Sequence, residues 1–195
     1  MEPRPATPED AEAVTETFAL AFNDDPTWSW AFPDDRRRLD QHRAWWRLFV
    51  DSAIPDGWVW MTEDCGAAAL WIPPGRPELN EEAEARYEPL MRELVGDWAD
   101  QVLQLTAAFD ANHPSEPHFY LSLLGTHPDH RGRGEGMALL ADNLARIDAE
   151  RAAAYLESSN PANDHRYARH GFVRTGEFSA PGGQPVVGCM WRDPR

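Results

Sequence analysis

The feature that most constrains the fold of this 195-residue chain is a strand–loop–helix unit in its second half. Residues 118–126, HFYLSLLGT, read as a strand, and residues 135–150, EGMALLADNLARIDAE, have the apolar spacing of a helix. A strand that passes through a glycine-rich turn into a helix exposes backbone N–H groups at the positive end of the helix dipole, where anions bind. The loop between the two elements contains Gly132, Gly134 and Gly136. We therefore expect an anion site here, with a purely structural turn as the alternative.

The spacing of these glycines excludes two common nucleotide-binding loops. The run HRGRGEG contains no GK[ST], so it is not the phosphate loop of a nucleoside triphosphatase. Its G-x-G-x-G spacing also differs from the G-x-G-x-x-G of dinucleotide-binding folds. By itself the loop is a weak signal, and the surrounding sequence must indicate what it binds.

The rest of the chain alternates helical and strand-like segments. Thr7 and Asp10 have the spacing of a helix capping box, and the helix that follows is expected to turn Ala13, Phe18 and Phe22 toward the core. Further helices are expected at 34–53, at 78–112 in two pieces broken near Gly96, and at 162–170. Strands are expected at 58–62 and 67–73, which form a hairpin, and at 153–158, 172–179 and 184–192. Residues 24–35 are expected to form an aromatic loop. This order predicts an α/β fold, a mixed sheet flanked by helices, in a single domain over residues 1–195.

The charge balance narrows the class of partner. The chain has 33 acidic and 18 basic residues, which gives a formal net charge of −15. A nucleic-acid binder needs a basic face for phosphates, so we expect no nucleic-acid partner. The acidity is compatible with a cationic or amine-bearing partner, although an acidic surface also serves solubility.

Cysteine use and apolar runs indicate the compartment. Cys65 and Cys189 form neither a C-x-x-C pair nor a group with histidines at metal-ligand spacing, so we expect reduced thiols and no metal site. The N-terminal run MEPRPATPEDAE lacks the apolar core of a signal peptide, and no apolar run approaches the roughly 18 residues that a membrane helix needs. These features predict a soluble, cytoplasmic monomer or homodimer without membrane contact.

The sequence around the glycine loop resembles a known family. R-x-x-G-x-G at 131–136 follows a strand and precedes a helix, a further strand and the pattern N-x6-Y-x3-GF at 160–172. This arrangement resembles the GCN5-related N-acetyltransferase (GNAT) superfamily, in which an R/Q-x-x-G-x-G/A loop binds the pyrophosphate of acetyl-CoA. The match covers residues 117–175. Within it, the EPH run, the LES strand and the tyrosine before the GF pair look most like the puromycin N-acetyltransferase-like group.

The resemblance implies the GNAT fold, with a helical insertion at about 77–113 between the third and fourth strands, and acetyl-CoA as the cofactor. Asn160 is implied as a CoA contact, and Asn163 is a second candidate whose alternative role is helix capping. The remaining implied contacts are Leu124, Gly125 and Thr126 for the pantetheine arm, and the amides of Arg131, Gly132, Arg133, Gly134, Glu135 and Gly136 for the pyrophosphate.

Glu135 departs from the family pattern, which usually has an apolar residue at this position. A carboxylate beside a pyrophosphate is repulsive. We expect it to be tolerated only where it points into solvent or pairs with Arg131 or Arg133.

Acetylation of an amine requires a neutral amine and a proton for the leaving thiolate. The resemblance implies Tyr167 as the general acid, with a structural core tyrosine as the alternative. Glu157, in the strand 153–158, is a candidate base, and a structural carboxylate is the alternative.

Three sets of residues are candidates for binding the acceptor, one of which is the helical insertion from Pro77 to His113. Alternation along 118–126 places His118, Tyr120, Ser122 and Leu124 on one face. The three polar side chains are expected to line a cleft in which the acceptor meets the thioester. Structural hydrogen bonding of these side chains is the alternative. The second set is an aromatic patch of Trp28, Trp30, Phe32, Trp45 and Trp46, for which core packing or a dimer face is the alternative.

Three functions are compatible with these features. The leading hypothesis is direct acetyl transfer, in a ternary complex, from acetyl-CoA to a primary amine of a small molecule such as an antibiotic or secondary metabolite. The second is acetylation of a peptide or protein amine, which an open acidic groove would favour. The third is an acyl-CoA-binding sensor without catalysis.

Overall fold

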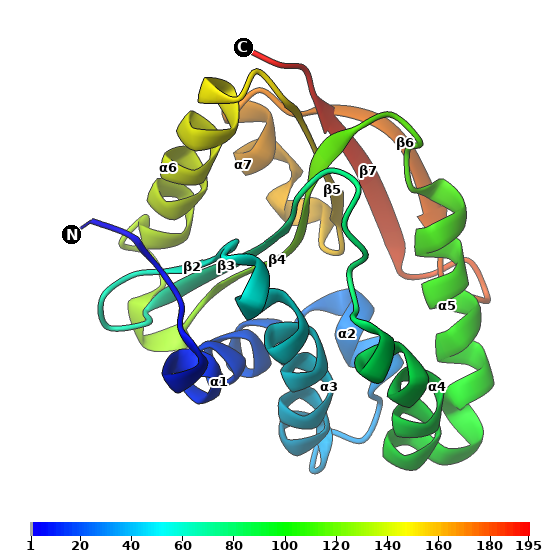
Figure 1. Cartoon of the computed structure of the whole chain (residues 1–195). Helices are drawn as coiled ribbons and strands as arrows, with labels where there is room; N and C mark the ends of the chain where they lie inside the picture. The colour runs from blue at the N-terminus through cyan, green and yellow to red at the C-terminus, as the bar shows by residue number, and fades with distance from the viewer. Residues whose placement is uncertain (1) are drawn as a thin grey trace.

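The computed structural model describes residues 2–195, which contain a seven-stranded mixed sheet (Figure 1). In spatial order the strands are β1 (Arg4–Pro5), β2 (Val59–Met61), β3 (Ala67–Ile72), β4 (His118–Thr126), β5 (Ala153–Ser158), β7 (Val186–Arg192) and β6 (Val173–Ser179). Neighbouring strands are antiparallel except β4 and β5, which run parallel. The expected mixed α/β architecture is confirmed.

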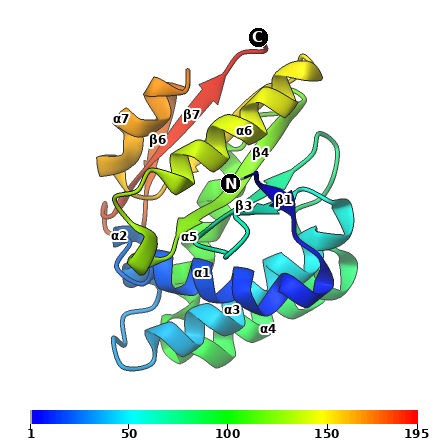
Figure 2. The same cartoon turned by 90° about the vertical axis from the view of Figure 1, so that its left-hand side faces the viewer.

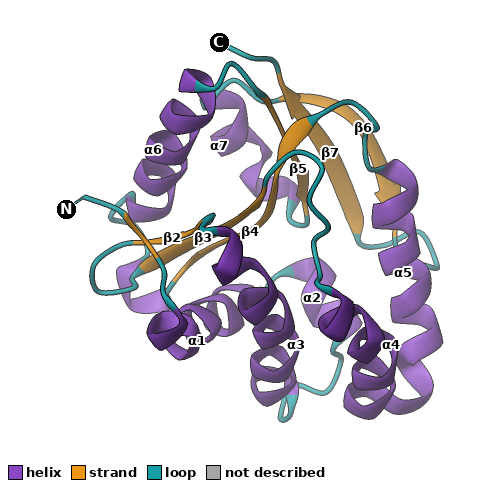
Figure 3. Ribbon diagram, viewed as in Figure 1, coloured by secondary structure: helices purple, strands orange, loops and turns teal. Residues whose placement is uncertain are grey.

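Helices cover both faces of the sheet. They are α1 (Ala11–Phe22), α2 (Pro26–Ala31), α3 (Arg38–Ala53), α4 (Glu81–Val95), α5 (Ala99–Asn112), α6 (Glu135–Ala149) and α7 (Asp164–Arg169). Figures 1 and 3 show α6 and α7 on one side of the sheet, α1, α3 and α4 on the other, and α5 beside β6. In Figure 2, α6 runs along the sheet above α1 and α3. Across residues 2–195, no helix has both the length and the apolar character needed to cross a bilayer.

Local signals explain several helix boundaries. Thr7 and Asp10 form the predicted capping box, with the Thr7 backbone N–H donating to the Asp10 carboxylate at 2.9 Å. Asn80 caps α4 by accepting a backbone hydrogen bond of 2.9 Å. Gly96, with φ of +57°, separates α4 from α5. The insertion predicted at 77–113 therefore consists of two helices between β3 and β4, as expected.

Other details differ from the sequence-based expectations. The segment 24–35 is not a loop throughout, because Asp25 caps and Pro26 begins the short helix α2. Helix α3 begins at Arg38, later than the predicted start. Ala13 is exposed, whereas a position in the core was expected. Strand β1 was not predicted, because two residues are too few for any alternation to be visible.

The sheet separates two apolar clusters. On one face, Leu121 of β4 packs in a cluster with Leu140 of α6. On the other face, Leu123 of β4 packs with Phe18 of α1 and Trp46 of α3. Each fully buried side chain of this kind contributes about 1.5–3 kcal/mol. This burial holds α1 and α6 against opposite faces of β4 and so positions the loop that precedes α6.

Candidate active site

Strands β4 and β5 separate along their length. Their parallel pairing joins 118–121 to 153–156 and ends there, although β4 continues to Thr126. Beyond this point the two strands share no register pairs within the described residues, and a cavity lies between them, which we call the inter-strand cleft. Of the predicted cofactor residues, its lining includes Leu124, Thr126, Arg131, Gly132, Gly134, Glu135, Gly136, Asn160 and Asn163.

The glycine loop closes this cleft at the N-terminus of α6. Gly132 and Gly134 have φ of +81° and +79°, in the left-handed region that glycine adopts without steric penalty, and Gly134 is the N-cap of α6. A Cβ on Gly136 would overlap the Thr126 hydroxyl, so only glycine lets α6 approach the end of β4 this closely. The unpaired N–H groups of the first helical turn therefore lie at the cleft, an arrangement suited to phosphate.

Two predicted cofactor residues lie outside the lining of the inter-strand cleft. A Cβ on Gly125 would lie 2.9 Å from Phe18 and 3.0 Å from Ala21 in α1, so this glycine serves the packing of α1 on β4. The Arg133 side chain is exposed and approaches Glu135 at 4.0 Å. The backbone of both residues belongs to segments around the cleft, but neither residue is part of the cleft lining.

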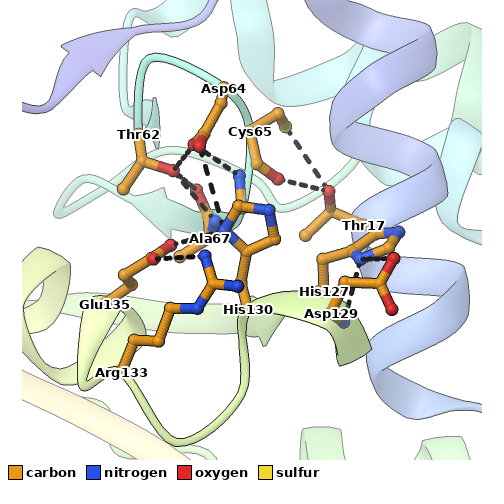
Figure 4. A network of polar contacts seen from close by, with 11 residues as sticks. Thr17, Thr62, Asp64, Cys65, Ala67, His127, Asp129, His130, Arg133 and Glu135 are labelled. Carbon is orange, nitrogen blue, oxygen red and sulfur yellow. Dashed lines mark hydrogen bonds and ion pairs between the residues drawn. The ribbon is translucent and has the colours of Figure 1, made fainter.

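Glu135 is held mainly by a histidine. Its Oε2 lies 3.0 Å from His130 Nδ1, and the same nitrogen is 3.8 Å from Asp64 Oδ2 in the turn between β2 and β3 (Figure 4). Arg133 is 4.0 Å away, whereas Arg131 donates to a backbone carbonyl at the end of α1 at 3.1 Å. The expected pairing with an arginine is therefore replaced largely by a contact with an imidazole, which holds the Glu135 carboxylate beside His130.

The same three residues resemble a cation site in composition. Asp64, His130 and Glu135 each place one potential ligand atom within 4.8 Å of the others. The hydrogen bond between His130 and Glu135 already accounts for their approach, and Asp64 accepts a backbone hydrogen bond from Gly66 at 3.1 Å. The arrangement ties the hairpin turn to the glycine loop without requiring an ion.

The two asparagines differ in their capping role. Asn160 Oδ1 accepts a 3.1 Å hydrogen bond from the Ala162 backbone and so caps the short turn before α7. Asn163 makes no capping hydrogen bond at the start of α7. The capping role weighed for Asn163 is therefore wrong, and the asparagine that caps is Asn160. Both side chains line the inter-strand cleft.

A second cavity, the aromatic chamber, adjoins the inter-strand cleft. The two cavities share Phe22, Leu124, Ser159 and Tyr167. The chamber is lined by the aromatic residues Phe22, Trp28, Trp45, Trp46, Phe49, Tyr87, Phe109, Tyr120 and Tyr167 and by the polar residues Glu78, Thr106, Asp110, Ser122, Glu157 and Ser159. These residues come from six helices and two strands together with the loops between them, so the chamber is built from segments far apart in the sequence.

Not every predicted acceptor residue reaches the chamber. Trp28, Trp46, Tyr120 and Ser122 line it. Trp30 does not; its ring packs at 5.2 Å from that of Trp98, whose indole donates to the Trp30 carbonyl at 3.1 Å. His118 is also absent from the chamber, because its buried side chain lies against His113. Phe32 is fully buried in the core.

Strand β4 does not alternate as predicted. Its register against β3 shifts at Leu70, and Ser122 is left without a partner as a bulge. Before the bulge, Tyr120 packs on the cluster of α1 and α3, whereas after it Leu124 packs on the cluster of α6. The expectation that Leu124 shares a face with Tyr120 is wrong. Of these β4 residues, Tyr120 and Ser122 line the chamber but not the inter-strand cleft, whereas Leu124 lines both.

Two carboxylates of the chamber, those of Glu157 and Glu78, have no basic side chain within hydrogen-bond distance among the described residues. The Glu157 side chain is 1% exposed, neither oxygen has a hydrogen-bond partner among the described residues, and His113 Nδ1 lies 3.7 Å from Oε1. Glu78 accepts a 2.5 Å hydrogen bond from the Ser122 hydroxyl. Burial, reinforced by the nearby Glu157, raises the pKa of Glu78 to about 7. No arginine appears in the chamber lining, so the chamber favours a cation.

Tyr167 stands where the two cavities meet. It lies on α7 and lines both the chamber and the inter-strand cleft. Its ring packs at 6.3 Å from Phe172, and its hydroxyl makes no hydrogen bond with any of residues 2–195. Burial, with Asp25 and Asp164 nearby, raises the pKa of Tyr167 to about 12, so the phenol is protonated at neutral pH. The hydroxyl is available to a group bound at the junction.

Sequence reasoning missed Glu78, Asp110 and Asp25. Glu78 and Asp110 belong to the insertion, which was expected to contribute to the acceptor pocket, but neither residue was singled out because an acidic residue there reads as ordinary surface. Asp25 had a signal, because Asp before Pro is typical of a helix start. Its carboxylate accepts from the Trp28 backbone at 3.2 Å and from the Ser159 hydroxyl at 2.8 Å, which holds α2 against the end of β5.

Comparisons with known proteins agree with this geometry. The profile described as "Acetyltransferase (GNAT) domain" matches residues 80–187. The solved structure of a histone acetyltransferase HPA2 and related acetyltransferase from Corynebacterium glutamicum is 25% identical, with a TM-score of 0.70 over 100% of this chain and 98% of that one. Arylalkylamine N-acetyltransferase 2 from Aedes aegypti is 11% identical, with a TM-score of 0.66 over 100% and 99%.

A third similar structure is the Drosophila melanogaster polyamine N-acetyltransferase. It is 16% identical, with a TM-score of 0.63 over 98% of this chain and 99% of that one. At these identities the two insect structures speak for the fold alone, whereas the GNAT profile covers more than half of the chain. Together with the glycine loop at the N-terminus of α6, this match shows that the chain belongs to the GNAT acetyltransferase family and is an N-acetyltransferase.

Proposed function

We propose that this enzyme transfers the acetyl group of acetyl-CoA to a primary amine of a small, cationic molecule with an aromatic or apolar body. The observation that carries the proposal is the aromatic chamber, which joins the inter-strand cleft at Leu124 and Tyr167 and contains the unpaired carboxylate of Glu157. A buried polar group without a partner is destabilising by about 1–3 kcal/mol, and more for a charged one. The ammonium group of an acceptor would remove this penalty.

The residues of the inter-strand cleft fit acetyl-CoA, which GNAT acetyltransferases use as the acetyl donor. The amides of 131–136 would bind the pyrophosphate at the N-terminus of α6. The edge of β4 that β5 leaves unpaired, at Leu124 and Thr126, would hydrogen-bond the pantetheine arm as an added strand does. Asn160 and Asn163 lie across the same cleft. When bound, acetyl-CoA supplies the acetyl group as a thioester.

Two residues of the chain would then handle protons. Glu157 would take a proton from the bound ammonium group, so that the amine nitrogen can attack the acetyl carbon. Tyr167, protonated at neutral pH, would give its proton to the departing sulfur. This assignment is supported by the position of Tyr167 between the two cavities and of Glu157 inside the chamber.

Similar structures support a small amine as the acceptor. The two insect enzymes are described as arylalkylamine and polyamine N-acetyltransferases, and both share the fold of this chain. The Corynebacterium structure is described as a histone acetyltransferase, which keeps a protein amine as the rival. The chamber supports the small amine, because aromatic side chains from α1, α2, α3 and α5 line it together with three carboxylates, a combination that suits a compact cation with apolar bulk.

A thiol-release assay with acetyl-CoA over an amine panel tests the proposal. The panel contains arylalkylamines, aminonucleosides, aminoglycosides, polyamines and short peptides with a free N-terminus or lysine. We expect the highest kcat/KM for a cationic amine with an aromatic or apolar body. Aminonucleosides also test membership of the puromycin-like group and a role toward antibiotics or secondary metabolites. Preference for peptides would favour the rival, and no turnover with any amine would contradict the proposal.

A further inference from the structure

His113 is the C-cap residue of α5 and lies between the buried Glu157 and the molecular surface. Its Nδ1 lies 3.7 Å from Glu157 Oε1, and its Nε2 lies 3.0 Å from His118 Nε2. The ring packs at 4.7 Å from Tyr120 and 5.3 Å from Tyr155, measured between ring centroids. The His113 side chain is 36% exposed, whereas that of Glu157 is 1% exposed. One imidazole thus lies beside a carboxylate of the chamber and is also exposed to solvent.

The hydrogen bonds around this pair define which nitrogens carry protons. His118 Nδ1 lies 2.6 Å from the Glu116 carbonyl oxygen, which only accepts, so this nitrogen carries the hydrogen. Burial lowers the pKa of His118, so its ring is neutral at neutral pH and its Nε2 is a bare acceptor. His113 Nε2 must then be the donor in the contact between the two rings. A neutral His113 therefore presents an unprotonated Nδ1 toward Glu157.

We infer that His113 receives from Glu157 the proton of the acceptor ammonium and releases it to water; the inference rests on the proposed function. The steps balance. The ammonium gives a proton to the Glu157 carboxylate, the resulting carboxylic acid gives it to His113 Nδ1, and the imidazolium gives it to water. The neutral amine nitrogen forms a bond to the acetyl carbon, and the carbon–sulfur bond breaks. The nitrogen loses its second proton as the amide forms, and the departing thiolate takes up one proton, so these two changes cancel. Ammonium and acetyl-CoA become amide, CoA and one free proton.

The surroundings of His113 suit this role. A protonated His113 lies at the C-terminal end of α5, where the helix dipole stabilises a positive charge. The titratable groups close to it are Glu157 and Tyr155 of β5, His118 and Tyr120 of β4, Glu78, and Asp110 of α5. A third cavity, which we call the outer cavity, is lined by His113 together with Arg76, Glu116 and His118. It shares Glu78, Phe109, Asp110 and Tyr120 with the chamber. The 3.7 Å separation needs to shorten by less than 1 Å, a change that substrate-bound active sites commonly make.

The test compares two classes of acceptor in two His113 variants. His113→Gln keeps an N–H donor for His118 but cannot carry a proton, and His113→Ala opens a space beside the outer cavity. With an alkylamine, which is an ammonium ion at neutral pH, we expect kcat to fall roughly 10- to 100-fold in both variants. With an aromatic amine, which is already unprotonated, we expect kcat to change less than about 2-fold. Added imidazole should restore turnover in His113→Ala but not in His113→Gln.

Controls separate this inference from the proposed function. His165→Gln, a substitution at an exposed histidine on α7, should leave both acceptor classes unaffected. The thermal shift with acetyl-CoA should be unchanged in all three variants. Equal losses with both acceptor classes, or an alkylamine rate close to wild type, would overturn the inference while the wild-type activity upholds the proposed function. Absence of wild-type turnover with every amine would overturn both.

Discussion

The inter-strand cleft and the aromatic chamber meet at Leu124 and Tyr167 but are built in different ways. The cleft lies between the separated ends of β4 and β5 and the loop 131–136, where glycines leave main-chain groups open to a ligand. The chamber is formed by side chains from six helices and two strands, with three carboxylates and no arginine in its lining. The cleft therefore suits a ligand whose phosphates and amides are recognised by main-chain groups, and the chamber suits a cation with apolar bulk.

This difference explains how one scaffold can keep a cofactor and change an acceptor. A backbone site tolerates many side chains, provided that glycines remain where φ is positive. A side-chain site changes with single substitutions and with insertions such as 77–113, which contributes Glu78, Phe109 and Asp110 to the chamber and ends at His113. The following substitutions separate the two sites, from the largest expected effect to the smallest.

Tyr167→Phe tests the junction of the two cavities. If the hydroxyl protonates the thiolate, kcat should fall roughly 10²–10⁴-fold, with little change in melting temperature or acetyl-CoA affinity. Steady-state kinetics and thermal shift measure both properties. Tyr120→Phe, which removes the buried hydroxyl on the acceptor side, is the comparison variant. A larger loss of kcat in Tyr120→Phe would indicate that Tyr120 in the chamber, rather than Tyr167, is the general acid.

Gly134→Val tests the cleft alone. An L-residue in the left-handed region costs about 1–2 kcal/mol, and a side chain at the N-cap of α6 would obstruct the anion site. We expect the acetyl-CoA thermal shift to disappear. Gly57→Val is a matched control, because Gly57 has nearly the same φ (+74°), and a Cβ at either glycine would meet no atom within 4 Å. Both variants should lose similar stability, and only Gly57→Val should still be stabilised by acetyl-CoA.

Trp28→Ala tests the chamber alone. Trp28 lines the chamber between Trp46 and Phe109, at centroid distances of 4.6 and 6.1 Å. Its loss should raise KM for an arylalkylamine by about 10-fold, in line with about 1–1.5 kcal/mol for an aromatic contact, while kcat changes less. Trp30→Ala is the control, because Trp30 packs on Trp98 outside the chamber. If Trp30→Ala raised KM as much, general destabilisation rather than acceptor contact would explain the effect.

The pH dependence of stability tests the charge of the chamber. The folded-state pKa of Glu78 is raised from its ordinary value to about 7, so the folded protein binds the proton more tightly than the unfolded chain. The stabilisation from this proton is fully present below about pH 4.5 and is lost as the pH rises toward 7. The free energy of unfolding should therefore fall over this window by on the order of 3 kcal/mol from Glu78. In urea titrations Glu78→Gln should remove that part of the slope; an unchanged slope would contradict the assignment.

The fold could be predicted from local patterns because they repeat along each element. The strand 118–126, the helix after the glycine loop and the two helices of the insertion each show their own periodicity or caps. The loop 131–136 was identifiable because its function depends on backbone shape, which glycine spacing reveals directly. Helix α2 was missed although Asp25 and Pro26 mark its start, because the aromatic residues that follow resemble a binding loop.

The acceptor side was harder to predict, because it depends on packing between distant segments. Alternation along β4 misplaced Leu124, since a bulge at Ser122 arises from pairing with β3 and has no mark in the sequence of β4 itself. Trp28 and Trp30 are two residues apart in the sequence, yet the first lines the chamber and the second packs on Trp98.

The sequence by itself determined the α/β order, the glycine loop at the N-terminus of a helix, and the family resemblance, because each of these follows from neighbouring residues. The tertiary structure alone decided that Glu78 and Asp110 of the insertion, Glu157 of β5 and the tryptophans of the N-terminal helices enclose one chamber. It also decided that His113 and His118 lie 3.0 Å apart beside Glu157. The physical reason is that burial and unpaired charge are properties of the assembled packing, and no stretch of sequence contains them.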